Sequence, residues 1–138
     1  MQKIIRNGSQ PSAKGPAEYF TGTVRLDTMF AADEPGRATG AIVTFEPGAR
    51  SHWHTHPLGQ QLLILTGVGW TQCEGGPRTE VRAGDVVVCG CNKRHWHGAS
   101  AKVAMSHLTV AEMLDGRNVD WMEPVTDEQY EAGELVTD

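Results

Sequence analysis

Short apolar runs separated by turn residues make up most of the chain from Thr21 onward. Glycine and proline cluster in the intervals between these runs, at 46–48, 57–59 and 74–77. The pattern predicts strands at 23–27, 41–45, 60–66, 69–73, 79–82, 85–89 and 103–110. Many short strands at this spacing are typical of an antiparallel sandwich or barrel, so we predict an all-β fold.

The two ends of the chain have a different pattern. The first twenty residues contain Gly8, Pro11 and Pro16, which predict an extended arm with little regular structure. Thr126, followed three residues later by Gln129, forms a capping box and predicts a short helix over 127–132. The sequence contains no linker or repeat, so we predict one domain over residues 1–138. It would consist of an arm at 1–20, a barrel at about 21–113 and a C-terminal segment at about 114–138.

The composition narrows the functional classes. The 138 residues are enough for one hydrophobic core, and 12 Lys and Arg against 17 Asp and Glu give a net charge of −5. This charge disfavours nucleic-acid binding, and no apolar run reaches the roughly 18 residues of a membrane-spanning helix. No secretory signal is visible at the start, and an odd number of cysteines fits no disulfide framework. We therefore predict a cytoplasmic protein that binds neither nucleic acid nor membranes. We expect its three cysteines to be ordinary half-buried residues: Cys73, Cys89 and Cys91.

Five of the six histidines fall in two tight clusters, at alternate positions of 52–56 and 95–97: His52, His54, His56, His95 and His97. Alternate residues of a strand share one face, so the members of each cluster are predicted to point the same way. Neutral imidazoles that face a barrel interior need partners for their nitrogens, and a divalent cation is such a partner. A solvated surface patch is the alternative, but the Pro, Gly and Trp residues around each cluster weaken it.

Two stretches around these clusters have a defined spacing. The first reads Gly48-x5-His54-x-His56-x3-Gln60-x6-Gly67, and the second reads Gly84-x5-Gly90-x-Asn92-x2-His95. Both resemble the conserved motifs of the cupin superfamily, small jelly-roll barrels (double-stranded β-helices) that bind one divalent metal. Gln60 stands where most cupins have Glu, and Gly90 and Asn92 stand where Pro and Gly are usual. The resemblance implies four metal ligands: His54, His56, Gln60 and His95.

Several segments spread over nearly the whole chain carry a closer resemblance: 8–10, 14–17, 20–25, 45–50, 54–60, 95–99 and 119–123. They are similar to the bacterial cupin hydroxynitrile lyases, which cleave (R)-cyanohydrins such as mandelonitrile to an aldehyde and hydrogen cyanide, and use manganese. Those lyases also carry Gln in the fourth ligand position. The resemblance implies a carbon–carbon lyase with one divalent metal per subunit, most simply Mn. Mixed nitrogen and oxygen donors also suit Fe, Ni or Zn.

The implied ligands are all uncharged, so a bound metal keeps its full charge as a Lewis acid. Cyanohydrin cleavage also needs a group that takes the hydroxyl proton and returns it to cyanide. Imidazole, which titrates near neutral pH, can do both. His97, two residues after His95, is the first candidate, and His107, which shares a strand face with Thr109, is the second. Alternatively His97 orients a ligand and His107 is a hydrogen-bonded core residue, while His52 is interpreted as a structural residue at the barrel rim.

Small and apolar residues are expected to complete a pocket for a small organic substrate: Ala41, Val43, Ser51, Leu62, Ile64, Thr109 and Ala111. Leu63 and Leu65 fall on the opposite face of their strand. We therefore expect a second copy of the chain to cover that face, in a homodimer or homotetramer, with the arm free to cross to the neighbour. Two other functions fit the sequence: a metal-dependent cupin dioxygenase and a non-catalytic binder of a small ligand.

Overall fold

The computed structural model describes residues 1–90 and 92–138, so the prediction for Cys91 lies outside the described residues. Nearly all of the regular structure in these two ranges is strand, which confirms the all-β prediction. The strands follow the order β1 (Ala13–Lys14), β2 (Phe20–Thr21), β3 (Val24–Ala31), β4 (Ala38–Phe45), β5 (Arg50–Ser51), β6 (His54–Thr55), β7 (Gln60–Cys73), β8 (Arg78–Arg82), β9 (Val86–Cys89), β10 (His95–Ala99), β11 (Met105–Glu112), β12 (Asp120–Trp121) and β13 (Leu135–Val136).

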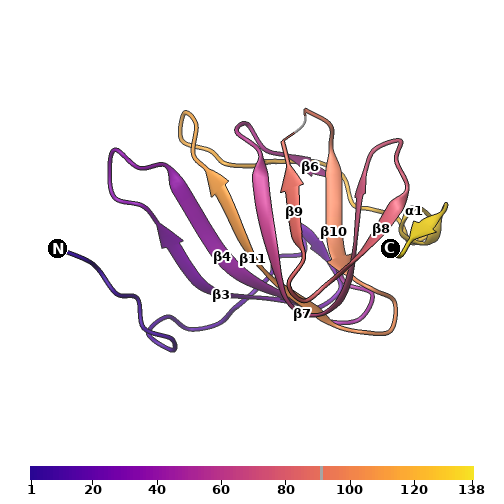
Figure 1. Ribbon diagram of the computed structural model, residues 1–138, viewed down its shortest axis with the longest axis horizontal. Helices are drawn as coiled ribbons and strands as arrows, with labels where there is room; N and C mark the ends of the chain where they lie inside the picture. The colour runs from indigo at the N-terminus through magenta and orange to yellow at the C-terminus, as the bar shows by residue number, and fades with distance from the viewer. Residues whose placement is uncertain (91) are drawn as a thin grey trace.

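Two sheets share the long strand β7. Its first half pairs with β11 and β9, and its second half pairs with β10 and β8. The first sheet continues from β11 through β4 and β3 to β1, and the second continues from β10 to β5 and β2. Figure 1 shows the strands fanning out from a common end, with β3 at one side and β8 with the helix at the other.

The bend between the two halves of β7 depends on Gly67. Its φ of 77° lies in the left-handed region, where only glycine is free of strain. A Cβ at this position would lie 1.8 Å from the carbonyl oxygen of Ala104, so no side chain fits. The sequence pattern predicted two strands, 60–66 and 69–73, and this prediction is wrong because one strand passes through the glycine.

The main core lies inside the curled sheets. Alternate residues of β4, β7 and β11 point inward, and the buried cluster includes Val43, Phe45, Leu62, Ile64 and Met105. A second, smaller cluster is formed by aromatic residues and one valine beneath the C-terminal helix: Trp53, Trp96, Val125 and Tyr130. The two histidine clusters are therefore held next to this second packed region, since Trp53 immediately precedes His54 and Trp96 immediately follows His95.

Helix α1 spans Asp127–Glu131. The predicted capping box is confirmed: Thr126 Oγ1 accepts from Gln129 N, and Gln129 Oε1 accepts from Thr126 N. The helix ends one residue before the predicted end, because Ala132 is extended. Five residues are far too few to cross a membrane, and within 1–90 and 92–138 no helix is long and apolar enough to do so.

The N-terminal arm is more ordered than predicted. It contains β1, which pairs with β3, and β2, which pairs with β5 of the same chain. The Gln10 side chain also bonds both backbone groups of Met29, at 2.8 Å each. The arm is extended, as predicted, and its regular structure is limited to these two-residue strands, but from Gln10 onward it is held against barrel strands of its own chain. The proposed domain boundaries stay a prediction.

Candidate metal centre and substrate pocket

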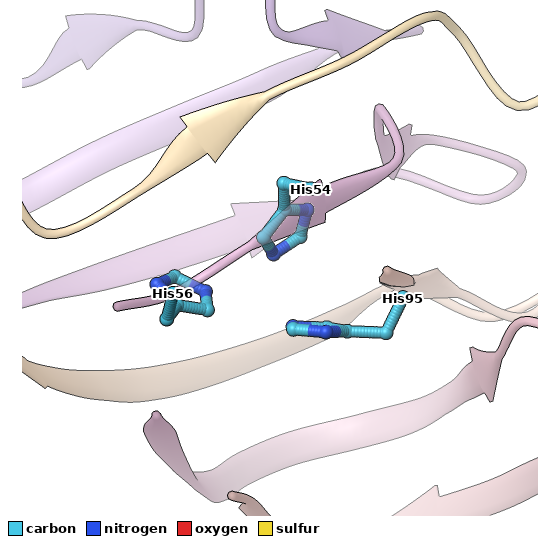
Figure 2. Close-up of side chains that lie close together, drawn as sticks. All are labelled: His54, His56 and His95. Carbon is cyan, nitrogen blue, oxygen red and sulfur yellow. The ribbon is translucent and has the colours of Figure 1, made fainter. Parts of the chain in front are cut away.

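Backbone pairing between β6 and β10 brings the two histidine clusters together. His54 and His95 are direct Cα partners in this antiparallel pair, and His56 follows β6 by one residue. Figure 2 shows the rings of His54 and His56, on one segment, facing the ring of His95 on another. One ring nitrogen from each of the three lies within 4.8 Å of the other two, close enough for a single metal ion.

Hydrogen bonds to the backbone orient all three rings. Nδ1 of His54 donates to the carbonyl of His52 at 2.8 Å, and Nδ1 of His56 donates to the carbonyl of Asn118 at 2.7 Å. Nδ1 of His95 faces the carbonyl of Lys93 at 3.4 Å. A carbonyl can only accept, so each Nδ1 carries the proton and each Nε2 keeps its lone pair.

Three of the proposed ligand atoms at the centre of this group lack a hydrogen-bond partner in the part of the chain that the structure describes. Nε2 of His56, Nε2 of His95 and Oε1 of Gln60 are buried and have no hydrogen-bond partner among the described residues. The amide nitrogen of Gln60 donates to Thr109 Oγ1 at 2.6 Å, which leaves its oxygen as the free acceptor. Unpaired buried acceptors are costly, and a divalent cation would satisfy them together. The three histidines and Gln60 therefore fit a metal ion as a set of ligands that are all uncharged.

Burial keeps these imidazoles neutral. It lowers the pKa of His54 well below its ordinary value, and it lowers the pKa of His95 to about 4. The pKa of His56 is lowered by the same cause. Only the neutral ring offers a lone pair, so the site is ready for metal at neutral pH. The alternative of a solvated histidine patch is wrong, because all five clustered histidines are buried.

His97 and His107 form a second pair beside this site. Nδ1 of His97 and Nε2 of His107 lie 3.2 Å apart, and both side chains are buried. Burial lowers the pKa of His97 well below its ordinary value and lowers the pKa of His107 to about 4. The expectation that these rings titrate near neutral pH is therefore wrong, and both are uncharged there. The two remaining nitrogens, His97 Nε2 and His107 Nδ1, have no hydrogen-bond partner in the described part of the chain.

A cavity of about 660 Å³ opens onto both groups. Five of the polar residues described above line this cavity: His54, His56, Gln60, His97 and His107. Four of the expected pocket residues also line it: Ala41, Val43, Thr109 and Ala111. The other three lie elsewhere in the described residues. Leu62 and Ile64 are packed into the core, and Ser51 Oγ accepts from the backbone N–H of His97 at 3.2 Å.

Sequence reasoning missed one side of the cavity, which the chain ends supply. Tyr19 and Phe20 of the arm and Trp121 of β12 line the cavity, together with Asn118 and Val119. No local sequence pattern predicts that these residues line the cavity, because residues a hundred positions apart meet only in the folded chain. The motif segments at 20–25 and 119–123 were the available signal.

His52 departs from the face predicted for its cluster. The chain leaves the strand between β5, which ends at Ser51, and β6, which begins at His54, so the alternation of side chains is interrupted. His52 is buried, yet it is not part of the described cavity lining. Its carbonyl group, which receives the proton of His54 Nδ1, contributes to the site instead.

The comparisons with known proteins agree with this geometry. Residues 41–111 match the family model described as the cupin domain, which is just over half of the chain. The chain belongs to the cupin family. Over 128 residues this cupin is 59% identical to an (R)-mandelonitrile lyase from Granulicella tundricola, covering 93% of this chain and 98% of that protein.

Solved structures support the fold. A cupin-like protein from Thermotoga maritima matches this chain with a TM-score of 0.79 and 37% identity, over 94% of this chain and 95% of that one. This similarity confirms the predicted cupin jelly-roll. A polyketide cyclase from Streptomyces resistomycificus has a TM-score of 0.65 at 17% identity, over 95% and 92% of the two chains. At that identity the likeness concerns the fold alone.

Proposed function

We propose that this cupin is a metal-dependent hydroxynitrile lyase. It would cleave (R)-cyanohydrins such as mandelonitrile to an aldehyde and hydrogen cyanide, or catalyse the reverse addition. The observation that carries the proposal is a set of four uncharged donors, three of which line a cavity with room for a small arylaldehyde. The 59% identity to an (R)-mandelonitrile lyase, over nearly all of both chains, supports the same reaction.

The metal proposed for this site is one divalent ion per subunit, held by His54, His56, Gln60 and His95. Manganese is the first candidate by family resemblance, and Fe, Ni and Zn suit the same nitrogen and oxygen donors. The ion would supply Lewis acidity toward the substrate oxygen. The neutral ligand set supports this role, because no carboxylate reduces the positive charge of the ion. Thr109, through its bond to the Gln60 amide, would keep the Gln60 oxygen directed at the centre.

The proposed acid–base group is the pair of His97 and His107. His97 Nε2 has no hydrogen-bond partner in the described residues, and in the tautomer whose Nδ1 donates to His107 it would take the proton of the substrate hydroxyl. The oxygen lone pair then forms the carbonyl double bond, the C–CN bond breaks, and its electrons leave with cyanide. The proton returns from His97 to cyanide, which gives aldehyde and hydrogen cyanide. His107 would stabilise the protonated state by accepting from His97 Nδ1 at Nε2.

The test is an assay of the purified protein on racemic mandelonitrile, with benzaldehyde and cyanide measured separately. Protein stripped of metal should be inactive, and Mn should restore the activity in proportion to the metal bound. His95→Ala should fail to recover in both metal content and activity. A rate that is unchanged under argon would separate the lyase from the dioxygenase alternative, since a lyase consumes no oxygen. Absence of cyanide release from fully metal-loaded protein would reject the proposal.

We also propose that a second copy of the chain covers the outer face of the first sheet, as a homodimer or part of a homotetramer. Ile42, Leu108, Leu63 and Val86 are successive cross-strand partners on β4, β11, β7 and β9. They form an apolar row that crosses this face, and Leu63 and Val86 are 39% and 61% exposed. A contiguous apolar face is typical of an interface, and two-fold symmetry would pair it with itself. The cytoplasmic location remains part of the proposal.

A further inference from the structure

The ends of the chain build an aromatic wall next to the metal centre. Trp121 is the Cα partner of His54 in the β6–β12 pair, and their ring centroids lie 4.9 Å apart. Tyr19 stacks on Trp121 at 4.7 Å with an interplanar angle of 18°, and the Phe20 ring meets it edge-on at 5.6 Å. The Trp121 ring is therefore fixed by three neighbouring rings, and it still lines the cavity.

The opposite side of the cavity has a different character. Leu26, Met29 and Val43, from β3 and β4, present aliphatic and thioether groups, and Phe30 of β3 adds one aromatic ring. The aliphatic side chains receive aryl and saturated rings about equally, because they contribute area and dispersion but no ring quadrupole, whereas the Met29 sulfur also favours an aromatic ring. A preference between two rings of similar size comes from the aromatic side chains and the Met29 sulfur, and among these Trp121 is the strand partner of a proposed metal ligand, His54.

We propose that Trp121 is a specificity-determining residue that favours substrates with an aryl group next to the reacting carbon. This inference rests on the proposed function. A substrate whose oxygen lies at the His54 centre has its substituent within reach of the adjacent Trp121 ring. Offset or edge-to-face contact between two aromatic rings adds stabilisation that a saturated ring of the same size does not receive. Tyr19 and Phe20 act as positioning residues, since they hold the indole at this angle.

The decisive comparison uses two substrates that differ only in the ring. These are mandelonitrile and the cyanohydrin of cyclohexanecarbaldehyde, each assayed as kcat/KM per bound metal. Trp121→Leu should lower the phenyl-to-cyclohexyl ratio by about 3- to 10-fold, the range expected for one aromatic contact. Trp121→Phe should retain most of the ratio, because it keeps a ring. Leu26→Val, a change between two aliphatic side chains of the same lining, is the matched control and should leave the ratio as it is.

A binding measurement separates this inference from the proposed function. Benzyl alcohol and cyclohexylmethanol are titrated calorimetrically into metal-loaded wild type and Trp121→Leu, with no turnover required. The wild type could release no cyanide and still bind the aryl alcohol more tightly than the saturated one, with this preference lost in Trp121→Leu. In that case the lyase proposal fails and the role of Trp121 stands.

If the phenyl-to-cyclohexyl ratio of kcat/KM per bound metal is the same in wild type and in Trp121→Leu, the assignment is overturned. The same holds if Trp121→Leu loses metal but keeps the ratio, since Trp121 then only supports His54. Should Trp121→Leu not fold, Tyr19→Leu provides the test, because it frees the indole and should lower the ratio in the same direction. An unchanged ratio in Tyr19→Leu would contradict the proposal.

Discussion

The buried His107 should make the stability of the metal-free protein depend on pH. Its side chain is fully buried, and burial lowers its pKa from the ordinary 6.5 to about 4. In the unfolded chain the ring takes a proton near pH 6.5, whereas in the folded chain it remains neutral until about pH 4. Acid therefore favours the unfolded chain, and the stabilisation present above pH 6.5 is lost as the pH falls toward 4.

The size of the effect follows from the two pKa values. The complete loss corresponds to about 3 kcal/mol, of which about 2 kcal/mol falls between pH 7.5 and pH 5. Replacing His107 by Gln removes the titrating ring. The fall in unfolding free energy over this interval should therefore be about 2 kcal/mol smaller in His107→Gln than in the wild type. The difference between two pH values cancels any constant cost of the substitution itself.

The assay is urea unfolding of chelator-treated protein, followed by circular dichroism at both pH values. Metal must be absent, because protons also compete with metal for the neighbouring imidazoles. His52→Gln is the matched control. Burial also lowers the pKa of His52, but less completely, so this variant should keep more of the wild-type pH dependence. A His107→Gln variant with the full wild-type pH dependence would refute the reasoning.

Three further changes test the site and the assembly. Gln60→Glu adds a negative charge to a neutral ligand set, so metal content after dialysis should rise while turnover per bound metal falls severalfold. His97→Ala should keep near-normal metal content, measured by atomic absorption, and lose about 10²–10⁴ in kcat for mandelonitrile. Loss of metal would instead make His97 a support for His95. Val86→Asp places a charge in the exposed apolar row and should give a 15 kDa species by light scattering, where the wild type is an oligomer.

The sequence predicted the inward face of the barrel well, because strand alternation is a local property. Gln60, on the inner face of β7, reaches the cavity as the alternation implied. The same rule failed at His52, where the chain leaves the strand for two residues and no local signal marks the break. The rule also does not measure depth: Leu62 and Ile64 share the face of Gln60 but lie further along β7, in the packed core.

The sequence could not predict the ionisation state of the histidines, for a related reason. Ordinary pKa values apply to solvated rings, and the burial that lowers the pKa of His97 and His107 depends on packing against Phe45. The pairing of the arm with β3 and β5 was equally hidden, since two-residue strands leave almost no periodic pattern. Contacts between Tyr19 and Trp121 join positions about one hundred residues apart, and a single sequence carries no record of such pairs.

The separation between barrel and chain ends has a consequence for how such a protein can diversify. The proposed metal ligands and the proton-transfer pair lie on strands and loops between residues 54 and 107, whereas the aromatic wall comes from residues 19–20 and 121. Point changes in these aromatic side chains can therefore reshape substrate preference while the ligands are kept, but the backbone of 118–121 must stay in place, because it pairs with His54 and accepts the proton of His56 Nδ1. In laboratory evolution, libraries at the side chains of residues 19, 20 and 121 would explore new substrates with the proposed ligands unchanged, whereas libraries in β10 would alter His95 and His97 themselves.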